Sequence, residues 1–306
     1  MLLSLCLGGQ WGAAGGALAL GPFTHLVLAR QLENPALAAE PSWRRALYAG
    51  ALAPDAGYYP GGEDSLAQAA HLLGPWEICR ALADLAATPE ERAFALGYAS
   101  HALLDRLGHA ELVNRLAGRP YSADPLNHKR VEWGLDCRLL SEPGNQWLWT
   151  VQADSRGGLG LWRRALERVY GKRVPAEVLE RSLAAELAEV WRLPRIFWLS
   201  GQAERPGAWL GNSAGWLLGH SLRPLAVSLL AWRGGYINER AVLDARPARP
   251  EDLRGLEEIL GRVAARVRDS AAIVDPPLGN LDADPACDRE ACAGAVQARA
   301  WLRGLP

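Results

Sequence analysis

Two stretches of the chain place metal-ligating types of side chain at intervals of four residues. They contain His101, Asp105 and His109 in the first stretch and His128, Glu132 and Asp136 in the second. In an α-helix, residues spaced by four share one face, with a drift of about 40° per step. Each stretch therefore predicts a helix with a stripe of imidazole and carboxylate groups. Facing stripes of this kind form internal metal sites in helix bundles.

The alternative is a solvated helix face with ordinary polar pairs. Such faces usually mix Glu with Lys and Arg, whereas these six positions hold only His, Asp and Glu. Imidazole and carboxylate groups together suit zinc and its first-row neighbours. We therefore favour a metal site, although any one of the histidines taken alone is better explained as an ordinary core or surface residue.

The helices that carry the stripes have clear start signals. Thr88, Pro89 and Glu91 form a capping box with proline at the first helical position, and this helix is expected to reach about Leu116. The next helix starts at Asp124, again followed by proline, so a short connection makes the two helices antiparallel neighbours. Further helices are expected at 24–32, 42–53, 65–73, 158–170, 175–200, 212–232 and 250–272.

Composition and charge narrow the function classes. The chain has 306 residues, of which 49% are hydrophobic and 22% charged, as is typical of a soluble globular protein. A formal net charge of −1 supplies no basic surface for nucleic acid or anionic membrane. Beyond the N-terminal residues, no uncharged apolar run reaches about 18 residues, so we expect no transmembrane segment.

We expect three parts along the chain: an N-terminal segment (1–19), one helical domain (20–275) and an irregular tail with a short helix (276–306). The first part is uncharged and ends in an A-x-A site, but it lacks a basic region. It is either a retained extension, which favours a cytoplasmic protein, or a cleaved signal segment, which implies secretion or the cell envelope.

Two features of the tail stay open. Cys287 and Cys292 form either one local disulfide or two free thiols, because five cysteines without a CxxC pair indicate no disulfide framework. Asp282 and Asp284, in "GNLDADP", lie in a loop that either reaches a functional cleft or forms an ordinary turn.

Further motifs, taken in order from about residue 21 to 140, resemble the zinc-dependent phospholipase C family of bacterial hydrolases. They are "FTHLVLA", "YAGALAPDAGYYP", "AAHLLGP", "SHALLDRLGH" and "NHKRVEWGLD". The first three contribute His25, Asp55 and His71. The resemblance implies an all-α, multi-helix bundle with a cluster of up to three zinc ions between its helices.

The resemblance also implies which residues bind each ion. The first ion would be held by Asp55, His71, His101 and Asp105, the second by His109, His128 and Glu132, and the third by His25 with Asp105 as a bridge. Asp55 is in addition the candidate catalytic proton acceptor. Asp136 has no counterpart among the ligands, and we expect it to orient a histidine or glutamate from behind.

Two departures from the family leave the count at two or three zinc ions per chain. Asp105 and His109 are one turn apart, whereas the well-known secreted members have a wider spacing. Those members also use their mature N-terminal Trp as a ligand of the third ion. Here 24 residues precede His25, and cleavage after Ala19 would make Leu20 the N-terminus.

The resemblance implies a zinc-dependent phosphodiester hydrolase, most simply phospholipase C-like, in which metal-activated water attacks phosphorus. Its substrate would be a phospholipid or another small phosphodiester. One alternative is a zinc nuclease or phosphomonoesterase, although the neutral charge does not favour polyanion binding. The other is a non-catalytic, metal-stabilised helical module that binds a lipid or partner. The substrate and the oligomeric state stay open.

Overall fold

The structure, a computed structural model, describes residues 20–33, 40–153, 155–199, 245, 248–268, 279–288 and 292–306. Every regular element in these ranges is helical, which confirms the predicted all-α class. The longer helices are α1 (Pro22–Gln31), α2 (Pro41–Leu52), α3 (Asp64–Leu72), α4 (Pro75–Leu85), α5 (Pro89–Gly108), α7 (Pro125–Ser141), α8 (Leu159–Tyr170), α9 (Ala176–Leu199), α12 (Pro250–Arg268) and α14 (Ala293–Gly304).

Short helical elements connect the longer ones. They are η1 (Ala53–Tyr58), η2 (His109–Val113), α6 (Asn114–Ala117), η3 (Tyr121–Ala123), η4 (Gln146–Thr150), η5 (Ser155–Gly157) and α13 (Pro285–Asp288). The element η2 is a single π-helical turn, whereas the other η elements are 3-10 helices.

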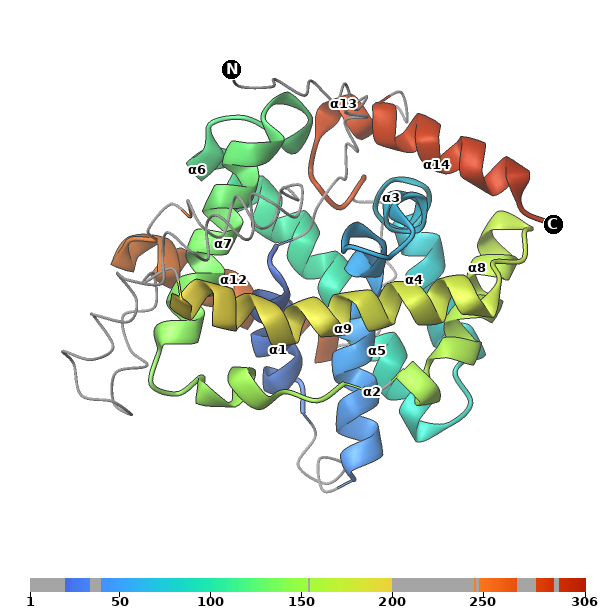
Figure 1. Ribbon diagram of the computed structural model, residues 1–306, viewed down its shortest axis with the longest axis horizontal. Helices are drawn as coiled ribbons and strands as arrows, with labels where there is room; N and C mark the ends of the chain where they lie inside the picture. The colour runs from blue at the N-terminus through green and yellow to red at the C-terminus, as the bar shows by residue number, and fades with distance from the viewer. Residues whose placement is uncertain are drawn as a thin grey trace, which may run out of the picture.

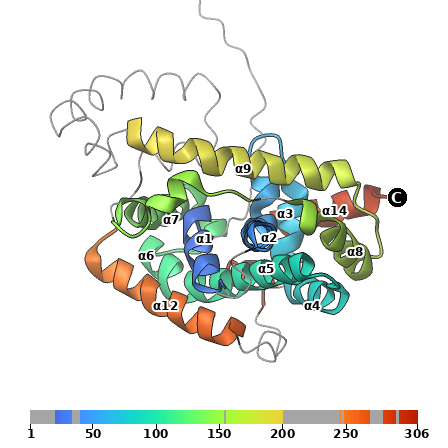
Figure 2. The same cartoon turned by 90° about the horizontal axis from the view of Figure 1, so that it is seen from below.

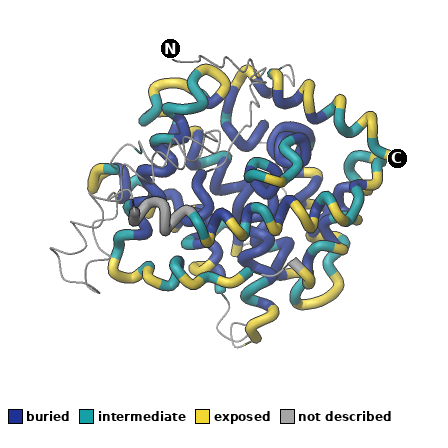
Figure 3. The backbone as a smooth tube through the Cα atoms, in the orientation of Figure 1, coloured by how far each residue is buried: buried dark blue, intermediate teal, exposed yellow. Residues whose placement is uncertain are grey.

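The helices α1, α2 and α5 form the centre of the molecule. They lie between α9 on one side and α12 on the other (Figure 2), and α14 packs on α3 near the C-terminus (Figure 1). The central helices are buried along most of their length, whereas the outer helices alternate buried and exposed positions (Figure 3). The polar stripes of the sequence therefore lie inside the bundle and not on its surface.

Two glycines let α2 and α5 approach closely. A Cβ at Gly50 would lie 2.1 Å from the carbonyl oxygen of Phe94, and one at Gly97 would lie 2.1 Å from that of Leu47. Any larger residue would force the two backbones apart. This contact brings the end of α2 beside the histidine-bearing half of α5.

The sequence predicts most of the described helices to within a few residues. The capping box of α5 is present, with the Glu91 amide donating to Thr88 Oγ1 at 3.1 Å, and the helical run continues through η2 to Ala117. The predicted helix at 212–232, residues 1–19 and the boundary at residue 275 lie outside the described residues.

The helix α4 is not among the helices predicted from the sequence. Gly74 and Pro75 lie at the junction of α3 and α4. Gly74 has a left-handed φ of 74°, and Pro75 occupies the first turn of α4. One dipeptide thus ends one helix and begins another.

None of the helices in the described ranges is both long enough and apolar enough to cross a bilayer. Cys287 and Cys292 form a disulfide, whereas Cys79 and Cys137 are free and buried. The local bridge considered from the sequence is therefore present in the structure.

Candidate metal centre

The structure brings all eight predicted ligands together in the interior. They form three groups, with His101 common to two of them: His25, His101 and Asp105; Asp55, His71 and His101; and His109, His128 and Glu132. Within each group the ligand atoms lie within 4.8 Å of one another, and every one of these residues is at most 3% exposed. We call the five residues of the first two groups the first set, and the remaining three the second set.

Asp105 is the centre of the first set. Its Oδ1 lies 3.1 Å from His25 Nε2, and its Oδ2 lies 3.3 Å from His71 Nε2 and 2.9 Å from His101 Nε2. Asp55, in the turn η1, places Oδ1 3.3 Å from His71 Nε2 and 4.0 Å from His101 Nε2. Four elements, α1, η1, α3 and α5, thus contribute to one buried cluster.

Backbone carbonyls orient two imidazoles of the first set. His71 Nδ1 lies 2.8 Å from the carbonyl of Ala67 in its own helix, and His101 Nδ1 lies 2.7 Å from that of Ala51 at the end of α2. A carbonyl only accepts, so each Nδ1 carries a proton and Nε2 is the nitrogen left for a metal ion. A backbone carbonyl bonded to Nδ1 orients the ring in the way expected of a histidine that binds a metal through Nε2.

Glu132 is the centre of the second set. Its Oε1 lies 3.2 Å from His109 Nε2 and 3.1 Å from His128 Nε2, while its other oxygen accepts from the buried Lys129. His109 begins the π-helical turn η2, a feature that is frequent at functional sites. Its Nδ1 lies 3.3 Å from the carbonyl of Leu281, in the C-terminal part of the chain.

In the first set, charged neighbours oppose the effect of burial on the pKa values of His71 and Asp105. Burial lowers the pKa of His71, but the adjacent carboxylates of Asp105 and Asp55 outweigh it and leave that pKa well above the usual value. Burial and the nearby His25 lower the pKa of His101. Burial would raise the pKa of Asp105, yet His101 and His25 hold it well below its usual range.

In the second set, too, charged neighbours oppose the effect of burial on the pKa values. Burial would raise the pKa of Glu132, but Lys129 and both histidines bring it to about 2. Burial lowers the pKa of His109, whereas its hydrogen bond with Glu132 raises it to about 9. Burial lowers the pKa of His128 despite its own contact with Glu132. In both sets an ionised carboxylate is kept in the interior by the groups around it.

The unpartnered atoms of the two sets fit metal ions. Several buried side-chain atoms have no hydrogen-bond partner in the described part of the chain: His25 Nδ1 and Nε2, Asp55 Oδ1, His71 Nε2, His101 Nε2, Asp105 Oδ2, and His128 Nδ1 and Nε2. Leaving so many buried polar atoms unpaired is costly. Imidazole nitrogens and carboxylate oxygens that converge in this way are the donors that zinc prefers.

Asp136, expected from the sequence to orient a histidine or glutamate, instead holds the start of α1. It accepts from the amides of Phe23 and Thr24 at 3.0 and 2.9 Å and from Thr24 Oγ1 at 2.6 Å. Burial raises its pKa to about 7, against these hydrogen bonds. A Cβ at Gly21 would lie 2.2 Å from its carboxylate. Asp136 therefore positions the turn that precedes His25.

Two further buried carboxylates near the sets are not among the predicted ligands. Asp282 is 1% exposed, and burial raises its pKa to about 6. Glu186 on α9 is fully buried, and burial together with the charge of Asp55 raises its pKa well above the usual value. The sequence singles out the loop of Asp282 without deciding its role, whereas Glu186 has no distinguishing motif.

The fold and the two sets define an all-helical protein with buried imidazole and carboxylate clusters suited to metal ions. Residues 24–190, more than half of the chain, match the family model described as zinc dependent phospholipase C, and the chain belongs to this family. The matched range contains all eight predicted ligands and ends before the loop of Asp282. No curated protein and no solved structure matches the chain.

Proposed function

We propose that this protein is a zinc-dependent phosphodiester hydrolase of the phospholipase C type. The observation that carries the proposal is the convergence of imidazole Nε2 atoms on Asp105 and Glu132, with His71 and His101 fixed from behind by backbone carbonyls. Membership of the family supports a metal-dependent, phospholipase-like hydrolase with a lipid substrate. The phosphodiester chemistry is the step that we add.

We assign the ligands to two ions and one residue to proton acceptance. Asp55, His71, His101 and Asp105 would hold one ion, and His109, His128 and Glu132 a second. Bound zinc supplies a Lewis acid for phosphoryl oxygens and lowers the pKa of water. Asp105 is engaged by three imidazoles, whereas Asp55 contacts only two, one of them at 4.0 Å. We therefore assign proton acceptance to Asp55.

A third ion would depend on processing of the N-terminus. The Leu20 amide donates to Asp105 Oδ1 at 2.9 Å, and His25 Nε2 lies 3.1 Å from the same oxygen. Cleavage after Ala19 would turn this amide into a primary amine beside both residues. Export is compatible with the disulfide of the tail. N-terminal sequencing and zinc counting test this: processed chains should bind three ions and unprocessed chains two.

The test of the function is turnover. Zinc-loaded protein should release diacylglycerol from phosphatidylcholine vesicles and cleave a p-nitrophenyl phosphodiester, and a chelator should abolish both reactions until zinc is restored. Asp105→Asn should be inactive with unchanged helicity by circular dichroism. Turnover by this variant equal to that of the wild type would refute the scheme. Faster cleavage of single-stranded DNA or of p-nitrophenyl phosphate would favour the nuclease or phosphomonoesterase alternative.

The burial of the sets favours a second candidate, a non-catalytic module stabilised by its metal. Every predicted ligand is at most 3% exposed, so the described residues leave almost none of the two sets open to solvent. In that case zinc would raise the melting temperature of the protein, as any ligand of the folded state does. None of the phosphoesters above would be cleaved.

A further inference from the structure

A loop from the C-terminal part of the chain lies against both sets. The amide of Leu281 donates to the carbonyl of His71 at 3.2 Å, and His109 Nδ1 donates to the carbonyl of Leu281 at 3.3 Å. One residue of the loop thus contacts a member of each set. The next residue in the chain is Asp282, whose backbone carbonyl accepts from Asn114 at 3.3 Å.

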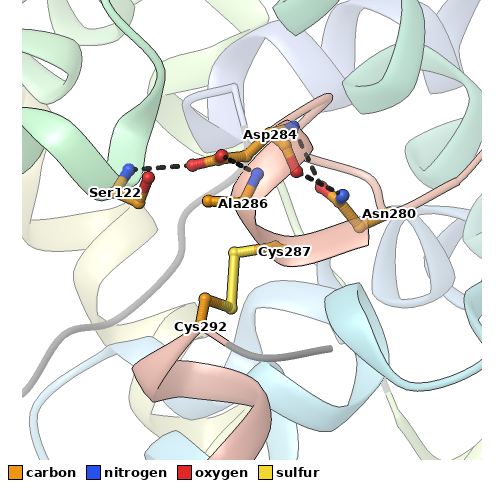
Figure 4. Close-up of a disulfide and its surroundings, with 6 residues drawn as sticks. All are labelled: Ser122, Asn280, Asp284, Ala286, Cys287 and Cys292. Atoms are coloured by element: carbon orange, nitrogen blue, oxygen red, sulfur yellow. Dashed lines mark hydrogen bonds between the residues drawn. A yellow bond between two sulfur atoms is a disulfide. The ribbon is translucent and has the colours of Figure 1, made fainter. Parts of the chain in front are cut away.

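The loop is held in place by a dense set of hydrogen bonds around Asp284 (Figure 4). Its carboxylate accepts from the amides of Ser122 at 3.1 Å and Ala286 at 2.9 Å. The side chain of Asn280 donates to the Asp284 carbonyl at 2.8 Å and accepts from the Asp284 amide at 3.2 Å. These contacts fix the backbone on both sides of Asp282.

Two more features restrict the loop. Ala283 has a φ of 49°, and among the described residues it is the one non-glycine residue with a positive φ. Such a backbone persists only where surrounding contacts impose it, and it is found at functional sites more often than elsewhere. The disulfide between Cys287 and Cys292 then closes the chain beyond the loop (Figure 4).

The Asp282 side chain has no hydrogen-bond partner in this fixed loop. The residue is 1% exposed, and neither of its carboxylate oxygens is hydrogen-bonded by any described group. Asp284, two residues along, is equally buried but uses both oxygens. A buried carboxylate without donors requires a cation or a proton. His71 and Asp105 of the first set and His109 and Glu132 of the second act on its charge.

We propose that Asp282 is an additional ligand of the metal centre, delivered by the C-terminal loop to the space between the first and second sets. This inference rests on the proposed metal centre. Asp282 lies beyond residues 24–190, the range that matches the family, so the ligand comes from the C-terminal region of this chain.

The experiment compares zinc affinity in three full-length proteins: the wild type, Asp282→Asn and Asp284→Asn. Competition with a chromophoric chelator gives the affinity, and elemental mass spectrometry gives the zinc content per chain. We expect Asp282→Asn to lower the affinity for at least one zinc ion by about tenfold or more. The Asp284→Asn variant keeps one acceptor for the loop amides, so its loss should be clearly smaller.

Thermal unfolding supplies a second readout that needs no competing chelator. Without metal, Asp282→Asn should melt at a higher temperature than the wild type, because an unpaired buried charge is gone. With zinc, the order should reverse. A purely structural role for Asp282 would give the same order in both conditions.

The outcomes separate the two proposals. A wild type that binds no zinc would refute the metal centre itself. A wild type that binds zinc, with Asp282→Asn binding equally well, would overturn the assignment of Asp282 alone. An equal loss in Asp284→Asn and Asp282→Asn would also overturn it, since the cause would then be the loop backbone and not the Asp282 carboxylate.

Discussion

The first and second sets use the same side-chain types but are held in different ways. In the first set, His71 and His101 bond to carbonyls of α3 and α2, and three imidazoles share Asp105. In the second set, Glu132 is shared between two histidines and a lysine. His109 is held by a loop carbonyl 172 residues away in the sequence.

The difference shows which parts of the molecule each set depends on. The first set and its supporting carbonyls lie within residues 24–190, the range shared with the family. The second set depends in addition on Lys129 and on the C-terminal loop, which lies outside that range. The C-terminal loop meets the first set only through the backbone of His71, whereas it holds an imidazole of the second set, so changes in the C-terminal region should affect the second set more than the first.

The largest expected effect that separates the sets comes from Asp105→Asn. Three imidazoles converge on this carboxylate. Removing a group that only orients a metal ligand typically lowers metal affinity roughly 10–100-fold, and the loss of zinc affinity in the first set should exceed that range. Zinc in the second set should be retained. Chelator competition with the purified variant measures both affinities, and equal losses in the two sets would contradict the separation.

Lys129→Met tests the charge balance of the second set. Removing one partner of a buried ion pair should lower the free energy of unfolding of the metal-free protein by about 3–5 kcal/mol. Zinc should recover part of this loss, because a cation then neutralises Glu132. Denaturant unfolding with and without zinc measures both effects. Lys172→Met is the control, since that lysine donates to the carbonyl of Leu305, away from the sets. Equal losses of stability in the Lys129 and Lys172 variants would argue against a stabilising ion pair between Lys129 and Glu132.

The double variant Cys287→Ser/Cys292→Ser tests the dependence on the loop. Without the disulfide the loop is less restricted, so the contact between Leu281 and His109 should weaken. We expect zinc in the second set to bind up to about tenfold more weakly, with a smaller change in the first set. Cys79→Ala, a change at a free buried cysteine, is the matched control. A larger loss of zinc affinity in the first set than in the second would contradict the dependence of the second set on the loop.

The smallest effect on zinc binding is expected from Thr24→Val, which keeps the shape of the side chain. It removes the 2.6 Å hydrogen bond to Asp136 and should lower the free energy of unfolding by about 1.5–3 kcal/mol, the value for a hydrogen bond to a charged group. The second set should keep its zinc. Thr150→Val is the control, because that exposed hydroxyl donates only to the carbonyl of Trp147. Loss of zinc from the second set would show that the hydrogen bonds between Asp136 and the start of α1 affect more than His25.

Periodicity and capping signals are local, and they predict the elements that they describe. The intervals of four residues place Asp105 with His101, and Glu132 with His128, and the capping box starts α5 where it is expected. These contacts depend only on helical geometry. The assignment of each residue to a particular ion came from the family resemblance and stays a prediction.

The contacts that the sequence does not predict join segments far apart in the chain. Asp136 bonds to Thr24 across 112 residues, and His109 bonds to Leu281 across 172. Neither pair has a local spacing to indicate it. The helix α4 is not predicted for another reason, since Gly74 and Pro75 signal both the end of one helix and the start of the next.

The most direct test of the two-set centre is zinc content by elemental mass spectrometry in the wild type, His101→Ala and His128→Ala. His101 belongs to both groups of the first set, and His128 belongs only to the second. The wild type should bind two or three zinc ions per chain, and His101→Ala and His128→Ala should each lose one of them. A wild type that takes up no zinc, or a single substitution that removes every ion, would contradict the account.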